Sequence, residues 1–357
     1  MKTDPAEACE RTVVIGAGSW GTALSILIAE KGLPVTLWAR DPKTADALTR
    51  DRENRKYLPG ARFPERIGVT SDLGEAVRGR GILVIAVPSH GLRKVTEAMA
   101  PHIDPSPHAT CPKAVVSATK GIENETLLFM TDVLAEVLPQ RLSHRFAALS
   151  GPSFAMETVM SLPTAVTVAA RDDDVCRLLQ SHFSTKTFRV YTNRDLIGVQ
   201  MAGALKNVLA IASGISDGMG FGHNTRAALI TRGLSEMTRL GLALGANPLT
   251  FAGLAGLGDL VLTCTGDLSR NRTVGLRLGQ GERISDILAG MSMVAEGVKT
   301  SRSARDLAQK TGVEMPITEK VFEVLHQGKD PREAVRELLA RPHRQEYLDQ
   351  ADFPPSA

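Results

Sequence analysis

One lysine lies in an otherwise apolar stretch and is the residue of this sequence best suited to acid–base chemistry. Lys206 is the only charged residue between Asp195 and Asp217. Burying a lysine is costly unless a partner or its surroundings compensate the charge, and lysines in such settings serve as general acids and bases. The amine could instead reach solvent along its aliphatic stem. We therefore take Lys206 as a candidate proton donor and acceptor.

Two polar segments downstream could complete a site with Lys206. A glycine-rich turn at residues 253–258 leads to Asp259, a carboxylate that could orient the lysine; this turn lacks the ending of a P-loop. The sequence Ser-Arg-Asn-Arg follows at residues 269–272. A hydroxyl, an amide and two guanidinium groups form a dense donor cluster suited to a phosphate. The same residues also fit the start of a charged helix that Ser269 would cap.

A glycine-rich motif near the N-terminus predicts a dinucleotide-binding turn. Val13–Ile15 fits a short buried strand, and residues 22–30 fit an almost uncharged helix. The intervening G-x-G-x-x-G motif supplies Gly16 for a tight turn, Gly18 for close approach of a pyrophosphate and Gly21 for helix packing. The helix N-terminus would bind the pyrophosphate. The motif alone is weak, but its flanking strand and helix are those the dinucleotide interpretation requires.

The end of the second expected strand bears on the choice of cofactor. This strand covers residues 35–38 and is followed by Arg40 and Asp41. An acid at this point is typical of NAD sites, whereas an arginine accommodates the 2′-phosphate of NADP. A solvated charge pair is the alternative interpretation. We expect NADP to be accepted and leave NAD open.

Further strands and helices alternate up to about residue 192, which predicts an α/β fold with a doubly wound parallel sheet. The expected strands cover residues 81–87, 114–118, 146–149, 164–169 and 188–191, and a helix covers 171–181. Residues 43–66 are expected to form a helix and an irregular loop. Lys120 follows one strand end, where ligands of open α/β sheets bind, although it could be a solvated loop residue.

From residue 195 onward, helical periodicity replaces the strand signals. We therefore predict a dinucleotide-binding domain over residues 11–192 and an all-helical substrate and catalytic domain over residues 193–342. Residues 1–10 and 343–357 are expected to be loose tails. The apolar run that contains Lys206 is interrupted by glycines and polar residues too often for a membrane span.

Composition excludes several classes of function. The net charge of +3, from 42 basic and 39 acidic residues, is too balanced for an electrostatic grip on nucleic acid or a membrane surface. Aromatic residues make up only 4%, which argues against stacking of bases. The four cysteines include no C-x-x-C pair, so neither a metal site nor a disulfide framework is expected. With no apolar signal core before the first strand, we expect a cytoplasmic protein.

The combined motifs resemble the bacterial-type NAD(P)-dependent glycerol-3-phosphate dehydrogenase family. The resemblance covers residues 13–339 and rests on GAGSWGTAL, AVPSH, SATKGIE, LSGPSFA, ALKNVLAIASGISDG, GLGDLVLTCTGDLSRNR and VAEGVKT. It implies a Rossmann domain followed by an all-α domain of the 6-phosphogluconate dehydrogenase-like type. It also implies interconversion of dihydroxyacetone phosphate and sn-glycerol 3-phosphate, with NAD or NADP, for glycerophospholipid synthesis.

The resemblance implies a role for individual residues. The implied proton acceptor is Lys206, with Lys120 and Asp259 in the same catalytic group. Cofactor contacts would come from the glycine-rich turn and from Ser19, Trp20, Arg40, Tyr57, Lys120, Ala155, Arg270, Val294 and Glu296. Substrate contacts would come from Lys120, Gly151, Ser153, Lys206, Asp259, Ser269, Arg270 and Asn271.

Two other functions remain open at this point. A related dehydrogenase of a different small acid would share the glycine-rich turn and a helical second domain, but it would not need the phosphate cluster at residues 269–272. A non-catalytic nucleotide sensor would not need Lys206 in an apolar helix. The sequence leaves the oligomeric state open, with a homodimer as one possibility.

Overall fold

The computed structural model describes residues 11–106, 108–291, 293–342 and 346, and these form two compact units. Unit 1 runs to Glu123 and resumes over Leu128–Gln200; unit 2 comprises Asn124–Leu127 and the chain from Met201 onward. The predicted tails, residues 1–10 and 343–357, lie outside the described residues apart from Glu346.

Unit 1 is built on an eight-stranded sheet with the order β10-β9-β8-β7-β6-β1-β2-β5. Its strands are β1 (Thr12–Ile15), β2 (Val35–Trp38), β5 (Ile67–Thr70), β6 (Ile82–Ile85), β7 (Ala114–Ser117), β8 (Phe146–Ser150), β9 (Thr164–Ala170) and β10 (Phe188–Asn193). Neighbouring strands are parallel except β8 and β9, which pair antiparallel. The predicted α/β class and largely parallel sheet are confirmed, and the reversal at β9 is the departure.

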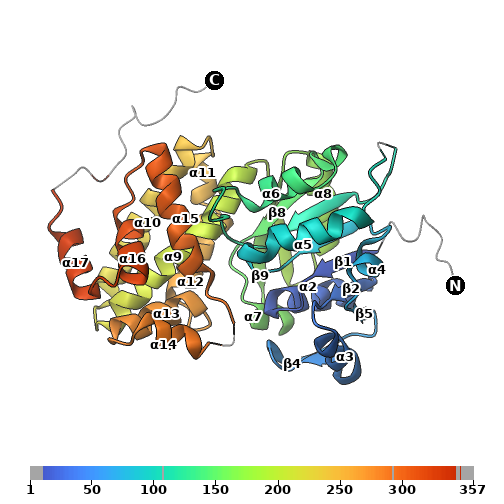
Figure 1. Cartoon of the computed structure of the whole chain (residues 1–357), viewed down its shortest axis with the longest axis horizontal. Coiled ribbons are helices and arrows are strands. Elements are labelled where there is room, and N and C mark those ends of the chain that lie inside the picture. The colour runs from blue at the N-terminus through green and yellow to red at the C-terminus, as the bar shows by residue number, and fades with distance from the viewer. Residues whose placement is uncertain (1–10, 107, 292, 343–345, 347–357) are drawn as a thin grey trace. The chain divides into compact units, whose positions relative to one another are not determined.

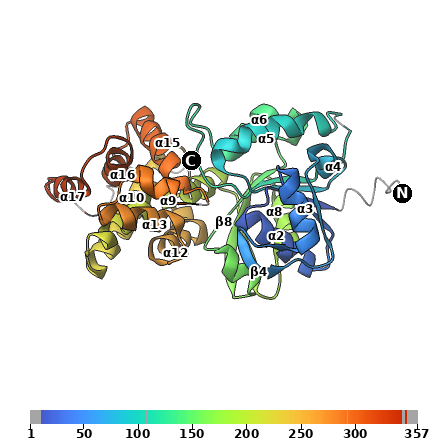
Figure 2. The same cartoon turned by 60° about the horizontal axis from the view of Figure 1, so that its bottom comes forward.

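Helices cover both faces of this sheet, as Figures 1 and 2 show. The helices of unit 1 are α2 (Ser19–Glu30), α3 (Pro42–Asp51), α4 (Leu73–Val77), α5 (Leu92–Met99), α6 (Met130–Val137), α7 (Ala155–Val159) and α8 (Asp173–Phe183). Alternate residues of β1 serve the two faces: Val14 packs with residues of α2, α3 and α8, whereas Val13 and Ile15 pack with residues of α4, α5 and α6. This period of two is that of a strand buried on both sides.

The polar segment 43–66 contains more structure than its composition predicts. After α3, it forms a small antiparallel pair of β3 (Glu53–Asn54) and β4 (Leu58–Arg62), where an irregular loop was expected. Strand β4 contains a proline and a glycine, residues that are depleted in strands. Such a pair is tolerated here because it is separate from the main sheet.

Unit 2 contains no strand in its described residues and is built around one buried helix. Its helices are α9 (Leu196–Gly218, which begins in unit 1), α10 (His223–Ala243), α11 (Pro248–Phe251), α12 (Asp259–Thr265), α13 (Arg270–Gly279), α14 (Ile284–Ala289), α15 (Glu296–Thr311), α16 (Pro316–His326) and α17 (Pro331–Leu339). Residues Val208, Ile211 and Ile215 of α9 pack with α13, α14 and α16.

Within the residues that the structure describes, two helical stretches are long and apolar enough to cross a membrane by length and composition alone. These are Leu196–Gly218, whose most apolar window is 89% buried in the structure, and Pro248–Thr265, whose window is 44% buried. The core helix of a soluble protein meets the same criterion. The apolar composition of α9 is therefore explained by its burial within the protein.

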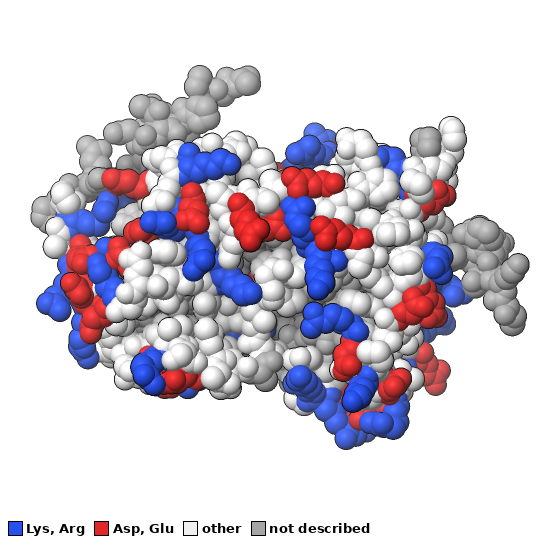
Figure 3. All heavy atoms as spheres, in the orientation of Figure 1, with Lys and Arg blue, Asp and Glu red and all other residues white. Residues whose placement is uncertain are grey.

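Two further sequence expectations concern cysteines and charge. Cys111 is disulfide-bonded, a bond that the cysteine spacing did not indicate, while Cys176 and Cys264 are free and buried. Basic side chains gather over α3 and β4 in the face shown in Figure 3. Their arginines are interleaved with acids: Arg50 pairs with Asp51, and further arginines approach Asp51 and Glu53. This region is therefore not a continuous basic surface.

Candidate functional site

The turn between β1 and α2 has the shape of a dinucleotide cradle. Gly16 has a φ of +117°, and a Cβ there would lie 2.6 Å from the carbonyl oxygen of Ala86. A Cβ at Gly21 would lie 1.9 Å from the oxygen of Gly16, so only glycine permits this packing. A Cβ at Gly18 would meet nothing within 4 Å, which leaves open space before the N-terminus of α2. The residues present therefore fit a bound pyrophosphate.

The two charged residues after β2 lie in different settings. The Asp41 carboxylate accepts hydrogen bonds from the backbone N–H groups of Lys43 and Thr44 and from the Thr44 hydroxyl, and so caps α3. These hydrogen bonds, led by that from the hydroxyl, lower the pKa of Asp41. Arg40 is exposed at the end of the strand. Both residues are exposed, but the Asp41 carboxylate is engaged in the helix cap.

A buried asparagine that the sequence analysis did not single out supports the glycine-rich turn. Asn54, 2% exposed, donates to the Ala17 carbonyl at 3.0 Å and to the Thr22 hydroxyl at 2.8 Å. Its own side-chain oxygen accepts from the backbone N–H of Tyr57 at 3.2 Å. Asn54 therefore ties the segment that carries Tyr57 to the cofactor turn. It lies in a polar, arginine-rich stretch, and no spacing in that stretch distinguishes it.

Three predicted substrate residues come together in unit 1 beyond β7 and β8. Lys120 Nζ donates to the Gly151 carbonyl at 3.3 Å, and the Ser153 hydroxyl donates to the same oxygen at 3.0 Å. Gly151 has a φ of +142°, and a Cβ there would lie 2.8 Å from the Cα of Val166. Ala155 begins α7 directly after this turn. The predicted residues of this segment thus converge on one backbone oxygen.

Lys206 is buried in unit 2 with a carboxylate and a hydroxyl on α12. It is 7% exposed, and its Nζ forms an ion pair with Asp259, which is 1% exposed. The same Nζ donates to the Thr263 hydroxyl at 3.0 Å. That hydroxyl also lies 2.6 Å from the Asp259 backbone oxygen, to which it donates. The ammonium is thus fixed by two groups one helical turn apart, at residues i and i+4.

Thr263 is a second residue that the sequence analysis missed. Its spacing from Asp259 was a usable signal, because residues four apart share a helix face. Cys264, next in sequence, has no comparable role: burial raises the pKa of its thiol to about 12. A thiol with that pKa remains protonated at neutral pH and is a poor nucleophile.

The Ser-Arg-Asn-Arg cluster does not present all its side chains to one ligand. The Ser269 hydroxyl caps α13 by accepting from the Arg272 backbone N–H at 3.3 Å. Arg270 is exposed and donates to the Val294 carbonyl at 3.0 Å. Arg272 turns away and pairs with Asp217 and Asp267. The segment is therefore a helix start capped by Ser269, as one of the two interpretations predicted, and phosphate binding by the same segment stays a prediction.

Asn271 connects the helix that carries Lys206 to the start of α15. Its Nδ2 donates to the side-chain oxygen of Asn207 at 2.9 Å, and its Oδ1 accepts from the Gly297 backbone N–H at 2.9 Å. Glu296 is the first residue of α15. Val294, two residues before it, accepts the hydrogen bond from Arg270, which holds this segment close to the start of α13. Asn271 thus links the helix that carries Lys206 with the segment that carries Val294 and Glu296.

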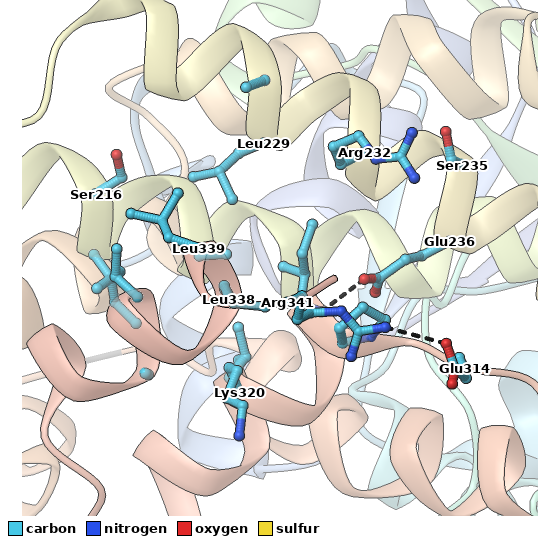
Figure 4. A pocket seen from close by; sticks show the side chains of 18 of the residues that line it. Ser216, Leu229, Arg232, Ser235, Glu236, Glu314, Lys320, Leu338, Leu339 and Arg341 are labelled. Carbon is cyan, nitrogen blue, oxygen red and sulfur yellow. Dashed lines mark hydrogen bonds and ion pairs between the residues drawn. The ribbon is translucent and has the colours of Figure 1, made fainter. Parts of the chain in front are cut away.

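A large cavity in unit 2 is lined by none of the predicted site residues. Its volume is about 1440 Å³, and residues of α9, α10, α16 and α17 line it. Figure 4 shows Glu236 pointing into it beside Arg341, which pairs with Glu314 at 3.1 Å. Burial raises the pKa of Glu236 to about 7, and its carboxylate accepts from the backbone N–H groups of Ile317 and Thr318. Glu236 thus caps α16.

Among the described residues, no group of three or more histidine, cysteine or acidic side chains is placed to hold a metal ion.

Comparisons with known proteins assign both halves of the chain. The family model for the N-terminus of NAD-dependent glycerol-3-phosphate dehydrogenase matches residues 11–176, and the model for its C-terminus matches residues 195–336. A glycerol-3-phosphate dehydrogenase [NAD(P)+] of Geobacter sulfurreducens is 56% identical over 332 residues, which are 93% of this chain and 97% of the relative.

Solved structures agree with this assignment. A glycerol-3-phosphate dehydrogenase from Coxiella burnetii has a TM-score of 0.87 and 41% identity, and the match covers 93% of this chain and 99% of the other. One from Saccharomyces cerevisiae has a TM-score of 0.77 and 25% identity, with coverage of 93% and 99%.

Proposed function

Because the chain belongs to the NAD(P)-dependent glycerol-3-phosphate dehydrogenase family, we propose that it interconverts dihydroxyacetone phosphate and sn-glycerol 3-phosphate. The observation that carries the proposal is the buried Lys206–Asp259–Thr263 cluster, which shares unit 2 with the Arg270 guanidinium at the start of α13. A proton donor and a phosphate ligand are the two groups this reduction needs from the protein. The product would supply the glycerol backbone of phospholipids.

Lys206 acts as the general acid in the reductive direction. When bound, NAD(P)H supplies the hydride that adds to C2 of the ketone. The ammonium of Lys206 donates a proton to the oxygen on C2 as negative charge develops there. The Asp259 carboxylate favours the charged form of the lysine and, with Thr263, fixes its direction. In the oxidative direction, the neutral amine removes the hydroxyl proton.

Arg270 binds the substrate phosphate. This group lies remote from the reacting carbon, so its binding energy serves to orient the ketone. Asn271 can add its second amide hydrogen, and Ser269 acts by fixing the start of α13. We also assign substrate contacts to Lys120, Gly151 and Ser153 of unit 1. This assignment is supported by the hydrogen bonds that Lys120 and Ser153 both donate to the Gly151 carbonyl.

The cofactor is held by the turn that contains Gly16, Gly18 and Gly21. Arg40 would contact the 2′-phosphate of NADP; the commitment of the nearby acid to a helix cap supports this role. Family membership supports the use of NAD or NADP. We assign the remaining cofactor contacts to Ser19, Trp20, Tyr57, Lys120, Ala155, Arg270, Val294 and Glu296.

We extend the proposal to a cytoplasmic enzyme that acts outside the membrane as a homodimer. The burial of the most apolar window of α9 within the protein supports a location outside the membrane. Light scattering on the full-length chain during size-exclusion chromatography gives the molar mass of the assembly directly. A mass of one chain would rule out the dimer.

A substrate panel tests the proposed reaction against its alternatives. Purified protein should oxidise NADPH or NADH when dihydroxyacetone phosphate is added, and should respond weakly to dihydroxyacetone, which lacks the phosphate. A preference for a phosphate-free keto acid would favour the related dehydrogenase. Binding of cofactor without turnover of any ketone would favour the nucleotide sensor.

A further inference from the structure

Helices α9 and α13 meet backbone to backbone through four glycines. A Cβ at Gly214 would lie 2.1 Å from the carbonyl oxygen of Arg272, and one at Gly218 would lie 2.1 Å from that of Leu276. The reverse contacts are equally close: a Cβ at Gly275 would lie 2.1 Å from the oxygen of Ile211, and one at Gly279 would lie 2.3 Å from that of Ile215. The contacts advance together along both helices, so the helices run in the same direction. No side chain can fit between them at these points.

An ion-pair cluster fixes the same two helices at the side of this contact. Asp217 of α9 is 6% exposed in its side chain. Its Oδ2 accepts from Arg272 Nε at 2.9 Å and Nη2 at 2.8 Å. Its Oδ1 accepts from Arg226 of α10 through Nε at 3.0 Å and Nη2 at 2.7 Å. One buried carboxylate therefore joins three helices through charge-assisted hydrogen bonds.

These contacts lie on the two helices that carry the two chemical groups of the proposed site, and they are C-terminal to both groups. Lys206 precedes Gly214 by eight residues on α9, about 12 Å along the helix axis. Arg270 begins α13, two residues before Arg272. The hydrogen bond from Asn271 to Asn207 joins the helices again beside the lysine. Rotation or sliding of α13 against α9 would therefore change the distance from Lys206 to Arg270.

We propose that Asp217 and Arg272 are positioning residues that set the separation between the proton donor and the phosphate ligand. The inference rests on the proposed function of Lys206 and Arg270. The glycine contacts fix how closely the helices approach, and the ion pair fixes the register of α13 along α9. Arg272 is thus adjacent in sequence to the proposed phosphate ligand, but its own role is to hold α13 against α9 through Asp217. Displacement of about 1 Å at a reacting group lowers rates by roughly 10²-fold, so a small slip is measurable.

The test compares a connected substrate with the same substrate in two pieces. The variants are Arg272→Lys, which retains the charge but loses the paired donors, and Asp217→Glu, which adds one methylene. Turnover is measured with dihydroxyacetone phosphate and with glycolaldehyde plus inorganic phosphite. We expect kcat/KM for the whole substrate to fall roughly 10- to 100-fold. Turnover of the pieces should fall less than about threefold, with unchanged activation by phosphite, because each piece can settle in its own subsite.

Arg277→Lys is the matched control, since Arg277 lies on the same helix and pairs with Glu282 at its exposed face. It should leave both activities unchanged, and melting temperatures of all variants show whether the fold is retained. Full whole-substrate activity in both variants would overturn the proposal. Equal losses for whole substrate and pieces would make Arg272 a phosphate ligand instead. Unfolding of both variants would show that the pair maintains the fold rather than the separation. Inactive wild-type protein would instead refute the proposed function.

Discussion

Replacing Lys206 by methionine separates the chemistry of this residue from its packing. Methionine keeps most of the apolar stem in α9 and removes the proton donor. A positioned acid–base group contributes about 10²–10⁴-fold to turnover, which corresponds to roughly 3–5 kcal/mol of the barrier. We expect kcat to fall by that factor while the affinity for NADPH stays unchanged, because the glycine-rich turn is untouched. Lys206→Arg should not restore turnover, since a guanidinium is a much weaker acid.

The same substitution also has a predictable effect on stability. Asp259 is 1% exposed and forms a buried ion pair with Lys206. Removing one partner of a buried pair costs about 3–5 kcal/mol, because the remaining charge is left uncompensated. The double variant Lys206→Met with Asp259→Asn removes that charge and should recover most of the lost stability. It should not recover turnover, so the two effects can be distinguished.

The assay combines three measurements on the wild type, Lys206→Met and the double variant. These are kcat with dihydroxyacetone phosphate at saturating NADPH, NADPH affinity from fluorescence, and the free energy of unfolding from denaturant titration. A folded, cofactor-binding Lys206→Met protein with near-normal kcat would refute the assignment of the lysine as proton donor. Recovery of turnover in the double variant would show that the loss came from the buried charge.

Four further predictions address the cofactor turn, the phosphate ligand and the cavity. Arg40→Ala should raise KM for NADPH about tenfold or more and change KM for NADH less, because a charge-assisted hydrogen bond contributes about 1.5–3 kcal/mol; equal effects would exclude a 2′-phosphate contact. Arg270→Ala should greatly lower kcat/KM for dihydroxyacetone phosphate with little change in NADPH affinity, and the opposite pattern would reassign it to the cofactor. Gly18→Ala should fold normally but bind NADPH weakly, whereas Gly21→Ala should lower the melting temperature, because its Cβ would meet backbone 1.9 Å away. Burial raises the pKa of Glu236 in the folded state from 4.5 to about 7, so the folded state binds this proton more tightly than the unfolded state does. The free energy of unfolding should therefore fall as pH rises from about 4.5 to 7, by up to about 3 kcal/mol. Denaturant titrations at pH 5 and pH 8 should show this decline in the wild type but not in Glu236→Gln.

Much of the architecture was predictable because its signals are local. The strand, glycine-rich turn and helix around Gly16 follow from adjacent residues, as does the buried character of α9. The antiparallel entry of β9 was not predictable, since strand direction depends on which edges meet in three dimensions. Strand β4 was missed because its proline and glycine carry no alternating pattern.

The site residues were predictable by type but not by direction. Residues 270–272 follow one another on a helix, where consecutive side chains point about 100° apart and do not face one ligand. The structure accordingly directs Arg270 to the Val294 carbonyl, Asn271 to Asn207 and Arg272 to Asp217. Helical spacing could have indicated that division and could also have identified Thr263. Asn54 could not have been found this way, because the two groups to which it donates, on Ala17 and Thr22, are distant in sequence.

Isotope transfer tests the central claim most directly. The full-length protein is incubated with dihydroxyacetone phosphate and NADPH that carries deuterium at the transferred position of the nicotinamide, and the product is analysed by mass spectrometry and NMR. The account predicts sn-glycerol 3-phosphate that is one mass unit heavier, with the deuterium on C2. Product without the label, a label at another carbon, or no reduction of the ketone would contradict it.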